Sequence, residues 1–303
     1  MLLLSANKQG KSIVRCLWLL ICLLITGCNQ SALFLVNGLA RFGDYSIMSD
    51  IRYGSSQLNR LDIYIPENLE EMQQAKRPVV IFFYGGCWGG CETGFKEEYL
   101  FVAQSLTSQG YVAVIADYRR YPDVRFPEII DDARQATEWV KKNIENYGGN
   151  PESIFLMGHS AGAHLAALLT LNETYLSSET RQATRGFIGL AGPYDFLPFT
   201  KLYQKEVFAP EETYAQSQPI NYVDGTEAPL LLLYGYDDET VKPRNIINLA
   251  EKIQQLGGRV ETRYYDEIDH VGILGSLSIP LRNRRQVMTD IISFITYYHS
   301  QTN

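Results

Sequence analysis

Several kinds of residue are scarce in this chain, and each scarcity excludes a class of protein. Lysine and arginine number 27 against 34 aspartates and glutamates, which gives a net charge of -7. Because phosphate backbones are bound by basic surfaces, this balance excludes a nucleic-acid partner. Cysteine occurs only 5 times in 303 residues, so the chain is not a small disulfide scaffold. With 46% hydrophobic and 20% charged residues, the composition is that of a folded globular protein.

Long apolar runs are missing except near the N-terminus. Lys8, Lys11 and Arg15 precede the uncharged stretch Cys16–Ile25, an order typical of a signal peptide. The stretch leads into Ile25-Thr26-Gly27-Cys28, which resembles a bacterial lipobox. A plain signal peptide or an uncleaved anchor is the alternative, although the run is short for a membrane-spanning helix.

The lipobox predicts how the N-terminal part of the chain is used. Residues 1–27 would be a lipoprotein signal peptide, Cys28 would carry the lipid, and residues 28–50 would form a tether. The protein would then be held by its lipid at the membrane of a bacterial cell envelope, on the periplasmic or extracellular face.

Two further cysteines, Cys87 and Cys91, lie four residues apart in a glycine-rich segment. An exported protein is in a compartment where disulfides persist, so a short-loop disulfide is one interpretation and two free thiols are the other. A metal site is not predicted, because one pair of cysteines without a second ligand pair cannot fill a tetrahedral site.

Short apolar segments alternate with amphipathic ones in the rest of the chain. The predicted strands are Ile51–Tyr53, Leu61–Ile65, Val79–Tyr84, Val112–Asp117, Ser153–Gly158, Gly186–Leu190, Pro229–Tyr234 and Arg263–Tyr265. The predicted helices are Phe95–Gln109, Ile129–Tyr147, Ala161–Leu171, Asn245–Leu256 and Leu281–His299. The middle strands are nearly continuous Val, Ile, Leu and Phe, which indicates parallel strands buried on both faces.

The alternation of strands and helices predicts one doubly wound α/β domain over residues 51–303. Residues 29–50 and about 192–227 lie outside the alternation, and neither segment has the features of a second domain.

The strongest chemical signal is Gly158-His159-Ser160-Ala161-Gly162, which follows a predicted buried strand and opens a predicted helix. In this setting a G-x-S-x-G sequence is typical of a nucleophile elbow, where two glycines permit a sharp turn that exposes the serine hydroxyl. We predict that Ser160 is a catalytic nucleophile.

A serine nucleophile needs a base, and the chain has 4 histidines. His159 belongs to the elbow and must point away from Ser160, while His164 lies one turn into the following helix and is expected to be structural. His299 is four residues from the chain end, where fraying is expected. His270, which follows the last predicted strand, is therefore the predicted base.

The base in turn needs an orienting carboxylate. Asp237, Asp238 and Glu239 follow the predicted strand that ends at Tyr234. The carboxyl ends of parallel strands are where open α/β sheets bind their ligands, so all three are candidates by position.

The chain resembles the α/β-hydrolase superfamily, and within it the branch of hormone-sensitive-lipase-like enzymes, kynurenine formamidases and feruloyl or acetyl-xylan esterases. The resemblance covers roughly residue 51 to the C-terminus. The motifs that carry it, besides the elbow, are Phe83-Tyr84-Gly85-Gly86-Cys87-Trp88, Asp117-Tyr118-Arg119, Phe126-Pro127, Asp131-Asp132-Ala133 and Gly235-x-x-Asp238-x-x-Val241. It implies an eight-stranded, mostly parallel sheet with helices on both faces. It also selects Asp238, because the family's acid follows the glycine by three residues.

One position departs from the family pattern, because Tyr84 stands where the H-G-G-x-W motif has histidine. In the family the oxyanion is bound by backbone amides further along this loop and after the nucleophile. The resemblance therefore implies that Gly86, Cys87 and Ala161 form the oxyanion hole. Tyr84 and Trp88 are either packing residues or substrate contacts.

The resemblance implies hydrolysis of a carboxylic ester with a short or medium acyl chain, through an acyl-serine intermediate and a Ser160, Asp238 and His270 triad. It implies no cofactor and no metal, and the expected partner is a small-molecule ester. The alternatives are an aryl or N-formyl amidase of the kynurenine formamidase type and a catalytically inactive binding protein with the same fold.

Overall fold

The computed structural model describes residues 28–67, 76–91 and 94–301, so the predicted signal peptide, residues 1–27, lies outside the described residues. The strands are β1 Tyr45–Arg52, β2 Arg60–Pro66, β3 Arg77–Phe83, β4 Val112–Ala116, β5 Gly149–His159, β6 Thr184–Leu190, β7 Leu230–Gly235 and β8 Val260–Tyr265. The α-helices are α2 Cys28–Ala40, α3 Leu100–Thr107, α4 Phe126–Asn143, α5 Ala161–Leu171, α6 Ser178–Ala183, α7 Leu202–Val207, α8 Arg244–Gln255, α9 Gly272–Gly275 and α10 Val287–Ser300.

The eight strands form one sheet in the order β1-β2-β4-β3-β5-β6-β7-β8. The first two pairings, β1 with β2 and β2 with β4, are antiparallel, and the others are parallel. Every residue of β4 and β7 is buried, as the continuous apolar sequences predict. The predicted α/β-hydrolase fold with a mostly parallel eight-stranded sheet is confirmed.

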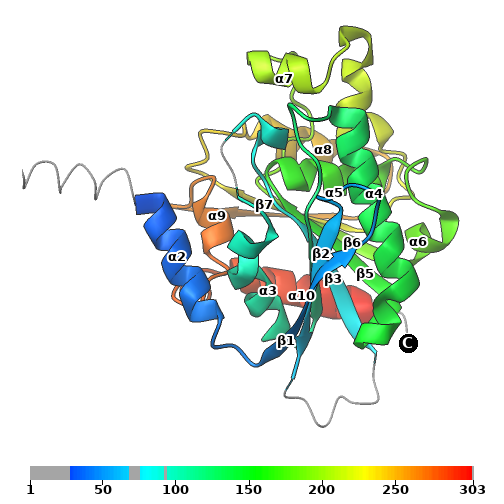
Figure 1. Ribbon diagram of the computed structural model, residues 1–303. Coiled ribbons are helices and arrows are strands. Elements are labelled where there is room, and N and C mark those ends of the chain that lie inside the picture. Colours follow the sequence, from blue (N-terminus) through cyan, green and yellow to red (C-terminus); the bar gives the residue numbers. More distant parts are fainter. Residues whose placement is uncertain (1–27, 68–75, 92–93, 302–303) are drawn as a thin grey trace, which may run out of the picture.

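Helices cover both faces of this sheet. Figure 1 shows α3 and α10 on one side and α4, α5 and α6 on the other. The first pair is joined by a contact of the Ser105 hydroxyl with the Met288 sulfur, at 3.1 Å. On the other face, α4 packs against α5 and α6, and α5 lies on β5 and β6.

The N-terminal part differs from the predicted tether. Residues 28–50 contribute α2 and most of β1, which begins at Tyr45 rather than at residue 51. Asn37 fastens α2 to the body, because its amide nitrogen donates to the Glu98 carbonyl and its amide oxygen accepts from the Phe101 amide. The predicted strand Ile51–Tyr53 overlaps only the end of β1, because the rest of this half-exposed edge strand has no clear apolar alternation. The folded unit therefore extends N-terminal of residue 51.

The segment without a clear period, residues 192–227, also has structure. It holds α7 and the short 3₁₀ helices Glu211–Ser217 and Pro219–Tyr222. Elements this short contain too few turns to produce a recognisable apolar period. Within the part of the chain that the structure covers, none of the helices has the length and apolarity needed to cross a bilayer.

Candidate active site

Ser160 occupies the sharp turn between β5 and α5. Its backbone has φ 53° and ψ -122°, a strained conformation for a residue with a side chain. A Cβ atom at Gly158 would lie 2.4 Å from the Gly162 carbonyl carbon, and one at Gly162 would lie 2.0 Å from the Phe83 carbonyl oxygen. Only glycine fits at either position, so the two glycines of the motif allow the elbow to pack against β3.

Three side chains from different elements form a continuous hydrogen-bonded chain. The Ser160 hydroxyl lies 2.9 Å from His270 Nε2, and His270 Nδ1 lies 2.8 Å from Asp238 Oδ2. The Asp238 side chain is fully buried, and its Oδ1 accepts hydrogen bonds from the Thr240 and Val241 amides. Because an ionised carboxylate only accepts, Nδ1 carries the proton and the Nε2 lone pair faces the serine.

Asp237, the rival acid by position, takes a different place. Its side chain is exposed and lines a separate depression with Glu267 and Asp269. The structure therefore brings Asp238, and not its neighbour, to His270.

The sequence predicts that His159 points away from Ser160. In the structure, the His159 ring contacts the main chain of His270, the predicted base. Its Nε2 lies 2.8 Å from the main-chain carbonyl oxygen of His270. Because a carbonyl only accepts, Nε2 is the donor. Burial, with a smaller contribution from His270, lowers the pKa of His159 to about 3, so the ring is neutral at neutral pH. Sequence reasoning missed this role, because it depends on where the distant 270 loop folds.

The loop after β3 has an unusual backbone. Gly86, Cys87 and Trp88 have φ values of 115°, 53° and 57°, three consecutive residues in a region that favours glycine. A disulfide joins Cys87 to Cys91, with the Cα atoms 5.3 Å apart, so the structure contains the disulfide rather than two free thiols. The bridge closes a short loop around this turn.

The residues predicted for the oxyanion hole lie at the nucleophile. Cys87 and Ala161 line the same cavity as Ser160, and Gly86 precedes Cys87 in the loop. Ala161 is the first residue of α5, where amides have no partner within the helix. Within the described ranges, the chain offers no hydrogen-bond acceptor to the amides of Gly86, Cys87 or Ala161.

His164 is structural, as predicted, but it also holds the loop after β3. Trp88 donates from Nε1 to His164 Nδ1 at 3.1 Å, and His164 Nε2 donates to the Ser217 carbonyl at 2.6 Å. Burial lowers the pKa of His164 to about 4, which keeps the ring neutral and able to accept from Trp88. The indole also stacks on Phe196, with ring centroids 5.6 Å apart.

Tyr84, the departure from the family motif, is fully buried and packs instead of facing substrate. Its hydroxyl donates to Asp117 Oδ1 at 2.7 Å, and its carbonyl accepts from the Tyr118 hydroxyl at 2.7 Å. The next residue, Arg119, forms a two-bonded pair with the buried carboxylate of Asp132. These motif residues therefore fix the base of the loop.

The last histidine lies at the opposite end of the sheet. His299 is in α10, and its Nδ1 is 2.8 Å from the Ser153 hydroxyl in the first half of β5, so this contact holds the last turn of α10 against the sheet. Ser160 follows the other end of that strand, roughly 20 Å away at 3.3 Å per residue.

A cavity of about 330 Å³ opens at Ser160. Its walls come from three segments, which are the loop after β3, residues 193–204, and residues 239–245. Trp88 lines the cavity although it is almost fully buried, so it combines packing with a place in the cavity wall.

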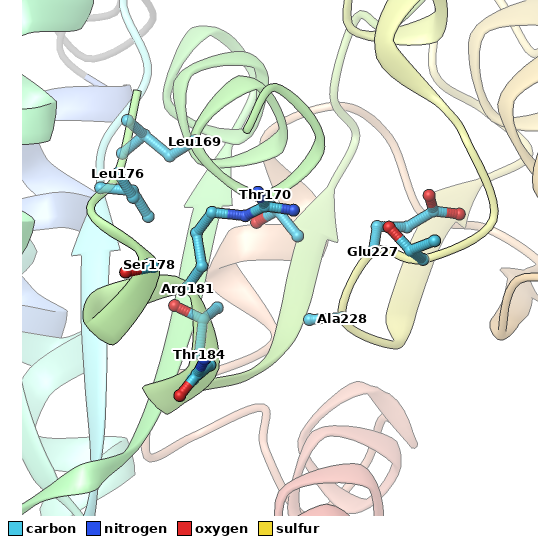
Figure 2. Close-up of a pocket in the computed structure, with 10 residues that line it drawn as sticks. Leu169, Thr170, Leu176, Ser178, Arg181, Thr184, Glu227 and Ala228 are labelled. Atoms are coloured by element: carbon cyan, nitrogen blue, oxygen red, sulfur yellow. The ribbon is translucent and has the colours of Figure 1, made fainter. Parts of the chain in front are cut away.

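A second cavity, of about 320 Å³, lies beside the far end of α5. Figure 2 shows Arg181 and Glu227 on opposite sides of it. Arg181 is already paired with Glu173 at 2.9 Å. Thr170, which lines this cavity, is ten residues along α5 from Ser160, or about 15 Å at 1.5 Å per residue. The second cavity is therefore separate from the elbow.

Comparison with known proteins places this geometry in a family. Residues 61–253 match the model of the BD-FAE family. The isoprenylcysteine alpha-carbonyl methylesterase of Arabidopsis thaliana is 26% identical over 294 residues, covering 89% of this chain and 66% of the plant protein. The esterase LipQ of Mycobacterium tuberculosis is 28% identical over 267 residues, covering 82% of this chain and 62% of its own. This chain therefore spans less than two thirds of the length of either relative.

Among solved structures, an inhibited esterase B from Lactobacillus rhamnosis superposes with a TM-score of 0.74 at 18% identity. The match covers 93% of this chain and 97% of the other. At that identity the match supports a shared fold and nothing further.

Proposed function

Because the chain belongs to the BD-FAE family, we propose that it is a serine hydrolase that cleaves carboxylic esters of short to medium acyl chain. The observation that carries this proposal is the unbroken hydrogen-bonded chain from Ser160 through His270 to Asp238. The relatives named as methylesterase and esterase support an ester as the bond that is cleaved.

The first half of the reaction acylates the enzyme. His270 Nε2 removes the hydroxyl proton as Ser160 Oγ bonds to the ester carbonyl carbon, and the carbonyl oxygen becomes an oxyanion. In this proposal the amides of Gly86, Cys87 and Ala161 bind that oxyanion. The bond to the alcohol oxygen then breaks, and His270 gives its proton to the departing alcohol.

The second half regenerates the serine. A water molecule loses a proton to His270 and attacks the acyl carbon, and the Ser160 oxygen leaves with that proton while the acid departs. Asp238 holds the imidazole in the tautomer that presents a lone pair to the serine and stabilises the imidazolium in both halves. The scheme needs no cofactor and no metal.

The size of the cavity supports a short or medium acyl chain. Its volume of about 330 Å³ is at the small end of ligand pockets, which span about 300 to 1,000 Å³. The apolar wall is formed by Trp88, Phe196 and Pro198, side chains that suit an aliphatic chain of a few carbons.

The test is hydrolysis of p-nitrophenyl esters from acetate to decanoate by the purified protein, with Ser160→Ala beside it. We expect turnover that is highest with short chains and is lost in the variant. No turnover combined with no labelling by a fluorophosphonate probe would refute the proposal. Labelling without ester turnover would instead favour N-formyl amide substrates.

We also propose that lipid on Cys28 holds the protein at a bacterial cell envelope. Phe34 and Leu35 on α2 are 79% and 60% exposed, and Phe42 just after the helix is 86% exposed. Large exposed apolar side chains are stabilised by entering the boundary between lipid headgroups and acyl chains. Their position close to Cys28 supports a membrane as the surface they meet.

A further inference from the structure

The active-site cavity carries a surplus of positive charge. Lys201, Lys242 and Arg244 all line the cavity that contains Ser160, against a single carboxylate, Glu239, among the described lining residues. The chain as a whole has a net charge of -7, so a local excess of cations at this position runs against its composition.

These three cations make few contacts within the protein. Arg244 donates from Nη2 to the Leu197 carbonyl at 2.8 Å, which leaves its other donors available. The Nζ atom of Lys242 lies 3.4 Å from the Glu239 carbonyl oxygen. The Nζ atom of Lys201 lies over the Tyr203 ring, 5.9 Å from the ring centroid. Among the ion pairs of the described chain, none involves any of the three cations.

Two of the cations also occupy positions that helix electrostatics disfavours. Arg244 is the first residue of α8, Lys242 lies two residues before it, and the first turn contains no acidic residue. The N-terminal end of a helix carries partial positive charge, so acids stabilise it and cations destabilise it. Helix stability therefore does not explain Lys242 and Arg244, and residues that work against local stability are a feature of functional sites.

We propose that the substrate carries, besides its scissile ester, a second group that is anionic at neutral pH and binds Lys201, Lys242 and Arg244. This inference rests on the proposed ester hydrolysis at Ser160. A carboxylate is the simplest such group, because the planar guanidinium of Arg244 offers it two parallel donors. The cations and the nucleophile share one cavity of about 330 Å³, so only a few bonds separate the anion from the ester.

The lysines and the arginine have complementary roles in this arrangement. An ammonium attracts an anion from any direction, whereas a guanidinium fixes its orientation through paired hydrogen bonds. Lys242 is the fourth residue after Asp238, whose carboxylate is held by the intervening Thr240 and Val241 amides. Binding of the anion therefore occurs on the same loop that orients the base.

The experiment compares anionic esters with neutral esters of similar size. On the acyl side the pair is monomethyl glutarate and methyl hexanoate, and on the alcohol side it is 4-acetoxybenzoate and 4-methylphenyl acetate. Rates are followed by titration of the released acid at constant pH. We expect the anionic member of at least one pair to have a kcat/KM about tenfold higher, since hydrogen bonds to charged groups have about that effect. The preference should shrink as salt rises, because salt screens exposed charges.

The variants identify the residues responsible. In Lys242→Gln combined with Arg244→Gln, we expect the anionic-to-neutral ratio of kcat/KM to fall about tenfold. Lys205→Gln is the matched control, because Lys205 is an exposed lysine of α7 that does not line the cavity, and its ratio should match the wild type. Lys242→Gln alone should not lower the Tm, because it removes a cation from the positive end of α8.

Three results would overturn the inference. Hydrolysis of both members of each pair at equal kcat/KM would refute the anionic substrate and leave the esterase intact. A preference that persists in the double variant would show that other groups recognise the anion. Failure of all esters, with no fluorophosphonate labelling, would refute the proposed function and this inference with it.

Discussion

The ring of His159 donates a hydrogen bond from Nε2 to the carbonyl oxygen of His270, 2.8 Å away. The residue directly before the nucleophile thus holds the backbone of the base. This contact couples the elbow, where Gly162 packs on the end of β3, to the loop that follows the last strand.

Removing that donor should displace His270. We expect His159→Phe to lower kcat about 10- to 100-fold with little change in KM, since a small misplacement of a reacting group has effects of that size. His159→Gln, whose amide can donate to the same carbonyl, should recover part of the loss. The measurement is steady-state hydrolysis of p-nitrophenyl butyrate. A Phe variant with wild-type kcat, or equal losses in both variants, would contradict the positioning role.

Adjacent carboxylates provide a matched test of the acid. Asp238→Asn should lower kcat by about 10⁴, because an amide at this position favours the wrong imidazole tautomer. Asp237→Asn is the control, since that exposed side chain has no contact with His270, and it should retain nearly full activity. The measurement is the single-turnover and steady-state rate of each variant, compared with the wild-type rates. Comparable losses in the two variants would show that the acid is misassigned.

Stability should fall as the pH drops from about 6.5 to 4. Burial lowers the pKa of His159 to about 3 and of His164 to about 4, whereas an unfolded histidine has a pKa near 6.5. The unfolded chain therefore binds protons in this window that the folded chain does not. Each histidine contributes a loss of about 1.4 kcal/mol per pH unit there, and above pH 6.5 its full stabilisation is present.

The variant His164→Gln isolates one of these two groups. Its amide can accept from Trp88 and donate to the Ser217 carbonyl, as the imidazole does, but it does not titrate. Urea unfolding between pH 7 and 5 should show a slope against pH that is smaller than the wild-type slope by about one proton. An unchanged slope would mean that His164 is protonated in the folded state.

Reduction of the Cys87–Cys91 disulfide should affect catalysis more than folding. The closed loop is short, so the chain-entropy model gives the bridge only about 2 kcal/mol of stability. Cys87, one end of the bridge, lies in the left-handed turn that carries the predicted oxyanion donors, and loss of one such donor typically lowers kcat 10²- to 10³-fold. We expect dithiothreitol to lower kcat at least tenfold with a small change in Tm. Cys87→Ser combined with Cys91→Ser should be slow and insensitive to the reductant, and wild-type activity unaffected by reduction would contradict the prediction.

Two features are expected to contribute to membrane attachment, which are the lipid on Cys28 and the exposed apolar side chains that follow it in the sequence. Cys28→Ala should release the protein from membranes on expression in a bacterial host, because one lipid-bearing residue is lost. A protein in which Phe34, Leu35 and Phe42 are changed to serine should keep its lipid but bind phosphatidylglycerol vesicles more weakly. As a control, serine at Leu202, which is 71% exposed on α7, should not change vesicle binding. Fractionation with membranes that does not depend on Cys28 would refute the anchor.

Much of this fold was accessible from the sequence because its signals are local. The central strands are continuous apolar runs, and the elbow needs only five consecutive residues between a strand and a helix. All eight predicted strands and the helices that separate them recur in the structure. Most of β1 and all of α2 escaped, because neither a half-exposed edge strand nor this helix has a clear apolar period.

The site was only partly accessible, for a different reason. Elimination among few histidines found His270, and the family spacing selected Asp238, which the structure places at hydrogen-bonding distance. His159 was set aside because only the folded 270 loop reveals its acceptor. Lys201 and Lys242 line one cavity although they are 41 residues apart in the sequence, and no local pattern joins them.

Much of the cavity wall is built outside the strands that carry the nucleophile and the oxyanion loop. Ser160 and the oxyanion loop are seated on β3 and β5 in the middle of the sheet, whereas much of the wall comes from residues 193–204 and 239–245, which lie outside the strands. Mutations in these connecting segments can change which ester fits while the sheet that aligns the nucleophile stays intact. New specificities can therefore evolve by substitutions in these two segments. A library of variants restricted to residues 193–204 and 239–245 is the first choice for selecting them in the laboratory.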